Sequence, residues 1–456
     1  MQTIGHADVV VAGGGLAGCC AALEAAEHGA RVLLLEKCAG LGGTSRISGG
    51  AIAFAGTELQ QRQQITDSPS RLLEDLRRCA GGQADEKLLA AFVAEQAQTF
   101  NWLQHQGVHF SSVQLGSGQS LPRSNRVDAA QMIDALAVNI NRHPMIRVMT
   151  SCAIRELHED GVVVDDGGRN GLIKTSAVVL CSGGFSRNEE LIRRHAPALA
   201  RAQRAGASSC TGDGLTIAEA RGAALLDMEK LSSTFGRHPA ASPDENGLLH
   251  PIYKGAVAVN VHGLRFADES QSYKVLGDAC LQQPQALVFQ IFDHRVMQQS
   301  VSDAATSNFA AALADGRVIA ADDLDSLALR AGIDAVGLRG TINRYNQHAA
   351  AGHDPDFGRS SLANGNGTLQ PVAQPPYYAY PCTSAILGTY CGLATDAAGR
   401  VLDTTGNPVA GLYAAGEISG GFHGNGYMTG SALAKAAVFG RIAGRHAALE
   451  SAKAPA

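Results

Sequence analysis

The chain has 456 residues, enough for two or three domains with a sizeable core, and 53 of them are glycine. Its formal net charge is -5 at pH 7, whereas proteins that bind nucleic acids or membrane surfaces carry an excess of positive charge. The charge therefore excludes these two classes and favours a small-molecule partner. No apolar run is long enough to predict a membrane span.

The N-terminus lacks the positively charged segment of a secretory signal peptide. The 10 cysteines form no C-x-x-C pair and have no histidine at metal-ligand spacing, so no metal site is expected. These features predict a cytoplasmic protein with reduced thiols.

The first predicted unit is a dinucleotide-binding βαβ motif. A strand over 8–12 leads to a glycine turn, a helix over 16–28 follows, and a strand over 31–35 ends at Glu36. In this motif Gly13 permits the turn, Gly15 lets backbone N–H groups approach a pyrophosphate, and Gly18 lets helix and strand pack closely. An acid at position 36 favours FAD or NAD over NADP. The predicted contacts are Gly13, Gly15, Leu16, Ala17, Gly18, Glu36 and Lys37.

A second glycine-rich loop follows, with hydroxyl side chains that suit a phosphate or a ribityl chain. Its predicted contacts are Gly42, Gly43, Thr44, Ser45, Ser48, Gly49 and Gly50. Residues 70–107 then predict helix, with an apolar stripe that indicates core packing. Strands are predicted over 147–149 and 161–165, and a buried strand that begins at 177 runs into a glycine turn at 183–184.

Composition changes after residue 225, which predicts an inserted second domain over 226–376. We therefore expect an α/β fold with a Rossmann-like dinucleotide-binding unit and an inserted second domain. The last segment carries one more strand and turn, 411–417, and a helix that begins near residue 430.

Several segments, in order along the chain, resemble the flavoprotein family of fumarate reductases and 3-ketosteroid dehydrogenases. They are Gly13 to Glu36, the loop 42–45, 178–185, 211–214, 263–269, 411–417 and 440–444. The resemblance implies bound FAD in a Rossmann-like domain built from 1–225 and 377–456. It also implies that 226–376 form an α+β cap (substrate) domain that closes over the isoalloxazine ring. Members with covalent flavin carry a histidine before the Ser48-Gly49-Gly50 equivalent, so its absence here implies non-covalent FAD. Further cofactor contacts implied are Ala153, Gly183, Asp213, Gly416, Glu417, Ser431, Ala432 and Leu433.

Fumarate reductases of this family hold a dicarboxylate with histidine and arginine side chains. The matching positions here are Tyr273, Tyr427 and Gly388. These departures remove charge and argue against fumarate, because a desolvated dicarboxylate needs cationic partners. Tyrosines at 273 and 427, with Thr429 nearby, are similar to the ketosteroid desaturase branch.

The resemblance implies desaturation beside a ketone, in which a proton leaves the α carbon and a hydride goes from the β carbon to flavin N5. We expect Tyr273 and Tyr427 to share the proton transfer, with Thr429 as a relay. The Gly430 N–H or one tyrosine O–H would polarise the carbonyl. A cyclic ketone, the size of a steroid or smaller, and an external electron acceptor are the expected partners.

Other interpretations stay open. Tyr273 is also compatible with cap packing, and Thr429 with capping of the last helix. His423 and the Arg237-His238 pair are candidates to bind an acidic group. Two other functions are a reductase of an α,β-unsaturated acid or ketone, and a non-catalytic FAD-binding electron carrier.

Overall fold

The computed structural model describes residues 2–231, 233–243, 245–302, 304–363, 365 and 367–453. The chain divides into two compact units. The first contains Met1–Ala196, Gly206–Leu231 and Gly388–Ala456, and the second contains Pro197–Ala205 and Ser232–Leu387. The mixed α/β class expected from the sequence is confirmed.

The first unit is built on a six-stranded sheet with the order β20-β21-β11-β2-β3-β7. Five of the strands are parallel, and only β20 pairs antiparallel, with β21. Because β2, β3 and β11 are buried along their whole length, their sequences are continuous apolar runs. The strands are β2 Val9–Ala12, β3 Val32–Leu35, β7 Ile146–Met149, β11 Ala177–Leu180, β20 Arg400–Leu402 and β21 Pro408–Ala414.

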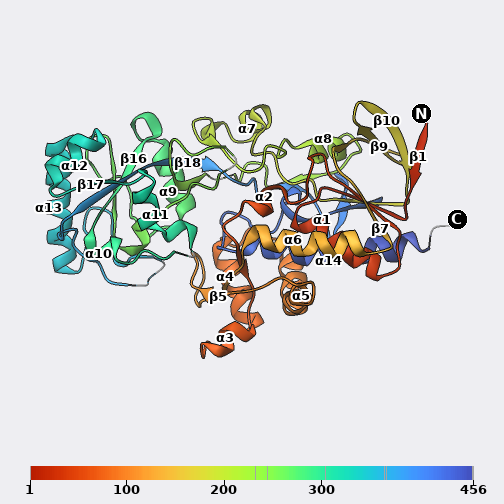
Figure 1. Cartoon of the computed structure of the whole chain (residues 1–456), viewed down its shortest axis with the longest axis horizontal. Helices are drawn as coiled ribbons and strands as arrows, with labels where there is room; N and C mark the ends of the chain where they lie inside the picture. Colours follow the sequence, from red (N-terminus) through yellow and green to blue (C-terminus); the bar gives the residue numbers. More distant parts are fainter. Residues whose placement is uncertain are drawn as a thin grey trace. The chain divides into compact units, whose positions relative to one another are not determined.

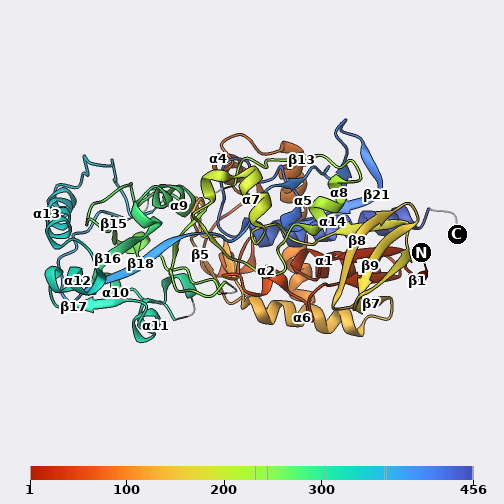
Figure 2. The ribbon, with the colours of Figure 1, turned by 90° about the horizontal axis from the view of Figure 1, so that it is seen from above.

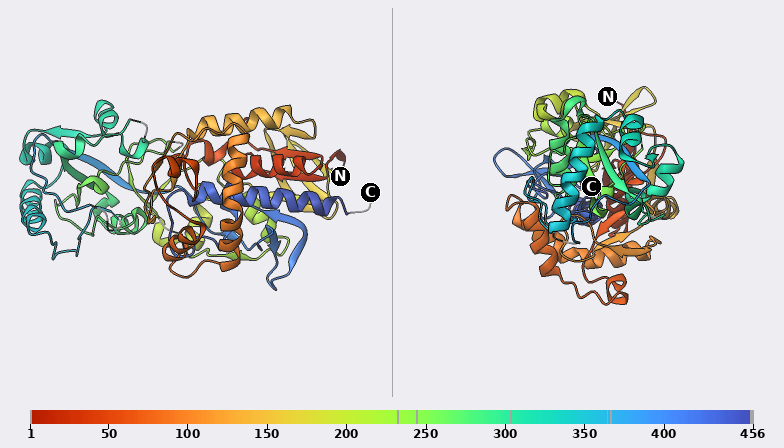
Figure 3. Two further views of the ribbon diagram at one scale, coloured as in Figure 1. Left: turned by 90° about the horizontal axis from the view of Figure 1, so that it is seen from below. Right: turned by 90° about the vertical axis from the view of Figure 1, so that its left-hand side faces the viewer.

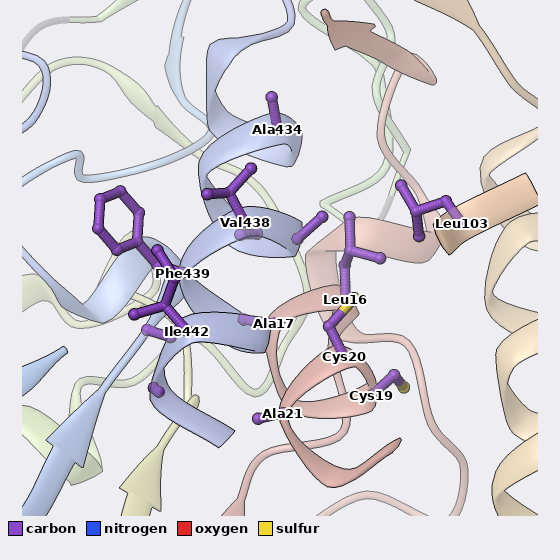
Figure 4. Close-up of a cluster of buried hydrophobic side chains, with 14 of the residues drawn as sticks. Leu16, Ala17, Cys19, Cys20, Ala21, Leu103, Ala434, Val438, Phe439 and Ile442 are labelled. Carbon is purple, nitrogen blue, oxygen red and sulfur yellow. The ribbon is translucent and has the colours of Figure 1, made fainter. Parts of the chain in front are cut away.

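Three helices pack on this sheet and run beside one another, crossed by a fourth, α5 (Figures 1 and 3). Figure 4 shows apolar side chains of α1 and α14 in one buried cluster, among them Leu16 and Cys20 of α1 and Val438 of α14. Gly440 lets the two backbones approach, since a Cβ there would lie 2.5 Å from the Ala17 carbonyl oxygen. The four helices are α1 Leu16–Glu27, α5 Glu86–His105, α6 Ala129–Arg142 and α14 Ser431–Ser451.

Smaller elements complete the first unit. Its second sheet has the order β1-β10-β9-β8 (Figure 2), and the others are β4-β6-β5 and β13-β19. The strands are β1 Thr3–His6, β4 Ala51–Ala53, β5 Ser112–Gln114, β6 Ser124–Arg126, β8 Cys152–His158, β9 Gly161–Asp166, β10 Arg169–Lys174, β13 Leu225–Leu226 and β19 Gly392–Leu393. The helices are α2 Gly43–Arg46, α3 Glu58–Arg62, α4 Pro69–Cys79, α7 Glu189–His195 and α8 Asp213–Glu219.

The second unit is a mixed sheet with five surrounding helices in the described residues. The strand β18, Tyr377–Ile386, is its centre and pairs with β12, β14, β16 and β17. The other strands are β12 Gln203–Arg204, β14 Thr234–Arg237, β15 Val257–Asn260, β16 Val288–Asp293 and β17 Ile319–Ala321. The helices are α9 Tyr273–Leu281, α10 His294–Met297, α11 Phe309–Ala314, α12 Leu324–Ala331 and α13 Ala335–Ala351.

These pairings explain where the unit boundaries fall. The boundary predicted at 376 precedes β18, but β18 belongs to the second unit because it pairs with β16 over six residues, Val288–Asp293. Residues 197–205, which the sequence placed in the first domain, join the second unit because β12 pairs with the end of β18.

Candidate functional site

The glycine turn after β2 has no room for side chains. Gly13 has φ +111°, and a Cβ there would lie 2.3 Å from the Cys181 carbonyl oxygen at the end of β11. A Cβ at Gly18 would lie 1.8 Å from the Gly13 carbonyl oxygen. The turn is therefore held against the next strand and the first turn of α1, which leaves its N–H groups at the carboxyl edge of the sheet.

Glu36 follows β3 at the same edge and is almost fully buried, with 6% exposure. Its two carboxylate oxygens accept hydrogen bonds from the N–H groups of Gly14 and Cys38, both at 2.8 Å. A carboxylate oxygen can accept more than one hydrogen bond, so Glu36 is held in place while it retains capacity for ribose hydroxyls.

The loop 42–45 closes over the start of α1. The Gly42 N–H donates to the Gly14 carbonyl at 2.8 Å, and the Leu16 N–H donates to the Ser45 hydroxyl at 3.1 Å. Gly15 is the N-cap of α1 and provides no side-chain cap. The other N–H groups of the first turn have no partner inside the helix, which is the arrangement that binds a pyrophosphate.

A buried polar atom beside this turn also fits a bound dinucleotide. The Ser182 hydroxyl is buried, and within the described part of the chain it has no hydrogen-bond partner. Its Cα would lie 2.9 Å from a Cβ at Gly13. Together with the side-chain-free turn and Glu36, this hydroxyl makes the residues present compatible with FAD.

Other predicted cofactor residues make contacts of their own. Lys37 forms an ion pair with Asp213 at 2.7 Å and also donates to the Thr211 hydroxyl. Burial raises the pKa of Asp213, but hydrogen bonds from Lys37 and Thr211 outweigh it and leave the pKa below its ordinary value. Ala153 lies in β8 and is paired with Asp165 of β9.

The remaining predicted contacts of the 42–50 loop are bound within the first unit. The Thr44 hydroxyl accepts from the Ala207 N–H at 3.2 Å, and the Ser48 hydroxyl donates to the Ser45 carbonyl at 2.8 Å. Gly43 has φ +48° and open space around it, whereas a Cβ at Gly50 would lie 2.1 Å from the Val127 carbonyl oxygen. Gly49 lies between Ser48 and Gly50 in the segment that leads to β4.

The turns after β11 and β21 meet at Glu417. A Cβ at Gly184, next to Gly183, would lie 2.2 Å from a Glu417 carboxylate oxygen. The same oxygen accepts from the Thr389 N–H at 2.8 Å and the Thr389 hydroxyl at 3.2 Å. A Cβ at Gly416 would lie 2.8 Å from the Ala17 Cβ, so this turn sits directly on α1.

Tyr427 lies just before α14 and is half-buried. Burial raises the pKa of its phenol to about 12, although hydrogen bonds from the N–H groups of Ala432 and Gly430 to the phenolic oxygen act in the opposite direction. Gly430, the N-cap of α14, has φ +85°, and a Cβ there would lie 2.8 Å from the Ala53 nitrogen. The helix start thus presents its N–H groups to the Tyr427 oxygen.

The other two predicted residues of this helix start pack or cap locally. The Ser431 hydroxyl donates to the Met428 carbonyl at 2.7 Å, and Leu433 packs against the main core.

Tyr427 belongs to a cluster of three aromatic rings. Its ring centroid lies 4.9 Å from that of Tyr390 and 5.5 Å from that of His423, and the Tyr390 and His423 rings are 5.1 Å apart. Sequence reasoning missed Tyr390, since an isolated tyrosine before a Cys-Gly pair forms no recognisable motif.

Gln119 is a second residue that the sequence did not reveal. Its amide is buried and donates to the Thr429 carbonyl and the Ser124 hydroxyl, both at 2.8 Å. Its oxygen accepts from the Gly116 N–H at 2.8 Å and the Arg123 N–H at 3.2 Å. The Thr429 N–H in turn donates to the Ser117 carbonyl at 2.9 Å. The 116–124 loop therefore fixes the backbone that carries Tyr427 and Thr429.

Tyr273 lies in the second unit, as the first residue of α9, and is half-buried. Its ring stacks on that of His250 with centroids 5.5 Å apart and an interplanar angle of 11°. The His250 imidazole is buried, which lowers its pKa to about 4 despite the hydrogen bond between its Nε2 and the Phe235 carbonyl. His250 is therefore neutral at pH 7, with Nε2 as the donor.

The predicted acid-binding candidates make contacts within their own units. Arg237 is buried and donates to the Gln203 side chain and to the Ser242 and Glu245 carbonyls. The His238 ring lies 5.6 Å from the Tyr380 ring. His423 is part of the aromatic cluster beside Tyr427.

Comparison with known proteins identifies the family. A model of the FAD binding domain family matches residues 8–433. A fumarate reductase (cytochrome) of Shewanella frigidimarina is 30% identical over 460 residues, which cover 98% of this chain and 78% of the relative. A 4-oxocyclohexanecarboxylate 2-dehydrogenase of Sinomonas cyclohexanicum is 30% identical over 535 residues, which cover 96% of this chain and 92% of the relative.

A solved structure agrees with these matches. The 3-ketosteroid-Δ4-(5α)-dehydrogenase of Rhodococcus jostii RHA1, in complex with 4-androstene-3,17-dione, superposes with a TM-score of 0.77 and 26% identity over 98% of both chains. Within the described residues, no helix combines the length and apolar character that crossing a bilayer requires. The chain is therefore an FAD-binding oxidoreductase of the FAD binding domain family, among the flavoproteins that include fumarate reductases and 3-ketosteroid dehydrogenases.

Proposed function

We propose that the protein introduces a carbon–carbon double bond beside the carbonyl of a cyclic ketone. The observation that carries this proposal is the phenolic oxygen of Tyr427, held by two backbone N–H groups at the start of a 21-residue helix. Such N–H groups and the positive end of a helix dipole stabilise a phenolate and offset part of the effect of burial, which raises the pKa of Tyr427 overall. Once its own proton has left, Tyr427 is suited to remove a proton from carbon.

The proton transfer follows from this placement. In the forward reaction the C–H bond at the α carbon breaks, its proton moves to the Tyr427 oxygen, and its electron pair becomes part of the new double bond. Because burial raises the pKa of Tyr427 to about 12, the phenol must first lose its own proton, and we propose that the half-buried Thr429 hydroxyl, two residues on, accepts this proton while it gives its own to solvent water. When bound, FAD accepts the hydride that leaves the β carbon.

Tyr273 is proposed to donate its O–H to the ketone oxygen, which stabilises negative charge there as the α proton leaves. The stack on His250 holds the phenol ring of Tyr273 in one orientation. Because the Gly430 N–H is directed to the Tyr427 oxygen, a tyrosine O–H is the better candidate for the carbonyl. An external electron acceptor is the remaining partner that we propose for the reaction.

The charge of the aromatic cluster favours a ketone over a dicarboxylate. Tyr390 and Tyr427 both have raised pKa values and stay neutral at pH 7, chiefly because of burial. The nearby buried amine, Lys435, donates to the Ser419 carbonyl at 2.5 Å. A neutral carbonyl compound needs no cation to replace lost hydration.

A reductase that saturates an enoate or enone is the second candidate, favoured by the fumarate reductase relative. An anaerobic experiment distinguishes the two directions. Cyclohexanone, 4-oxocyclohexanecarboxylate and a saturated 3-ketosteroid are each mixed with the oxidised holoprotein, and fumarate and 2-cyclohexenone with the pre-reduced holoprotein. Prompt bleaching of the flavin by a ketone supports the desaturase. Reoxidation by fumarate without bleaching by any ketone would replace it with the reductase, and no reaction in either direction would favour an electron carrier.

A further inference from the structure

Tyr390 has an unusual backbone conformation for an aromatic residue. Its φ is +54°, in the left-handed region that bulky side chains rarely adopt. The chain is fixed on both sides of it. Thr389 is bonded to Glu417 through its N–H and its hydroxyl, and at Gly392 a Cβ would lie 1.9 Å from the Ile418 carbonyl oxygen. Such conformations persist where the surroundings over-determine them, and they cluster at functional sites.

This conformation directs the ring toward Tyr427. The two ring planes are inclined by 32°, with centroids 4.9 Å apart, and the His423 ring stands edge-on to Tyr390 at 69°. Gly388 lies beneath the phenol end of the ring, because a Cβ at Gly388 would lie 3.3 Å from Tyr390 Cζ. The Tyr390 ring thus fills the space that a side chain at position 388 would need.

We propose that Tyr390 is a specificity-determining residue whose ring, beside Tyr427, binds the flat face of an uncharged cyclic ketone and excludes carboxylates. This inference rests on the proposed function, because it places the substrate against Tyr427. The ring provides a large apolar surface at a fixed angle, and the phenol is half-buried and therefore accessible to a ligand. Desolvating a carboxylate against this surface is unfavourable, whereas a ring of methylene groups gains contact.

The phenol of Tyr390 stays neutral in this environment. Burial, together with the proximity of Tyr427 and Glu417, raises its pKa well above the ordinary range for tyrosine. Tyr390 therefore presents an uncharged ring at pH 7. Its contribution is to binding and selection, while the proton transfer is assigned to Tyr427.

Binding measurements on the oxidised holoprotein test the proposal without turnover. The probes are 2-cyclohexenone and 4-oxocyclohex-2-enecarboxylate, whose binding is followed by the change in flavin absorbance. We expect Tyr390→Leu to raise the Kd of 2-cyclohexenone about tenfold to hundredfold. The ratio of the two Kd values, that of the carboxylate probe divided by that of 2-cyclohexenone, should fall at least about tenfold. Tyr390→Phe keeps the ring and should change both quantities less than about threefold.

The matched control is Tyr413→Phe, which removes a hydroxyl bonded to Glu450 elsewhere in the first unit. It should leave both Kd values unchanged. A structural effect alone would lower FAD content or thermal stability and leave the ratio of the two Kd values intact, and that outcome would overturn the proposal. Wild-type protein that fails to bind 2-cyclohexenone would overturn it as well.

The experiments distinguish failure of the proposed function from failure of the role proposed for Tyr390. If ketones never bleach the wild-type flavin but Tyr390→Leu still shifts the ratio of the two Kd values, the desaturase assignment falls and the role of Tyr390 in binding stands. Where ketones do bleach the flavin, Tyr390→Leu should raise KM and change kcat less than about threefold. A loss confined to kcat would place Tyr390 in the proton transfer and refute its role in selection.

Discussion

The amide of Gln119 offers a sharp test of how the Tyr427 segment is positioned. Substitution Gln119→Leu removes four hydrogen bonds, to Thr429, Ser124, Gly116 and Arg123. At roughly 1 kcal/mol for each net hydrogen bond, we expect a loss of about 4 kcal/mol in unfolding free energy. A domain with a stability of about 5–15 kcal/mol would remain folded.

The same substitution should slow catalysis. Once the Thr429 carbonyl has lost its partner, the segment that ends at Gly430 is no longer fixed to the 116–124 loop. A displacement of about 1 Å at a reacting group lowers rates by up to about a hundredfold, so we expect flavin reduction by a ketone to slow tenfold to hundredfold. Urea unfolding and anaerobic stopped-flow absorbance measure the two effects.

The matched control is Gln96→Leu. Gln96 is also buried, but its amide bonds to the N–H and carbonyl of Ala55, at 2.9 and 3.1 Å. We expect it to lose roughly 2 kcal/mol of stability and to keep kcat within about threefold. The positioning role of Gln119 is refuted if each variant loses the stability expected for its lost hydrogen bonds but both variants have the same kcat.

Three other predictions follow from the same contacts. Tyr427→Phe should retain FAD but slow flavin reduction at least about a hundredfold, as expected for a general base, whereas an unchanged rate would remove Tyr427 from the mechanism. Gly18→Ala should abolish FAD binding, read from the 450 nm absorbance, because its Cβ meets the Gly13 carbonyl at 1.8 Å. Gly340→Ala is the control, since nothing lies within 4 Å of its Cβ and its φ is outside the left-handed region, and loss of FAD there too would show that the clash is not the cause. The lowered pKa of His250, about 4 against 6.5, means that the unfolded chain binds its proton first as the pH falls. The free energy of unfolding should therefore be independent of His250 above about pH 7 and lower by about 2 kcal/mol at pH 5. In urea titrations a His250→Asn variant should lack this part of the pH dependence.

The parts of the fold that could be predicted from the sequence are those encoded locally. The Gly13 turn, the helix after it and Glu36 occupy 24 consecutive positions, and their spacing reflects one βαβ unit. The predicted helix over 70–107 is two helices, α4 and α5, because Gly81 and Gly82 adopt positive φ values between them. The Gly81-Gly82 pair that separates the two helices is itself a local feature of the sequence.

Contacts between distant segments could not be predicted in this way. Gln119 bonds to Thr429 across 310 positions, and Lys37 to Asp213 across 176. Tyr390 acquires its conformation from Glu417 and Ile418, which are brought to it only by the folded sheet. Periodicity and short motifs do not predict such pairings, because these depend on the tertiary structure.

The packing of α1 against α14 has a consequence for biosynthesis. Arg441 of α14 forms a buried ion pair with Glu24 of α1, although 417 positions separate them. A ribosome completes the entire second unit before α14 emerges, so the nascent chain carries the apolar side of α1 and an unneutralised Glu24 throughout that interval. The first unit, which carries the nucleotide-binding turn, therefore completes its fold late in synthesis. We expect that a premature stop anywhere before α14 would release a chain unable to retain its flavin.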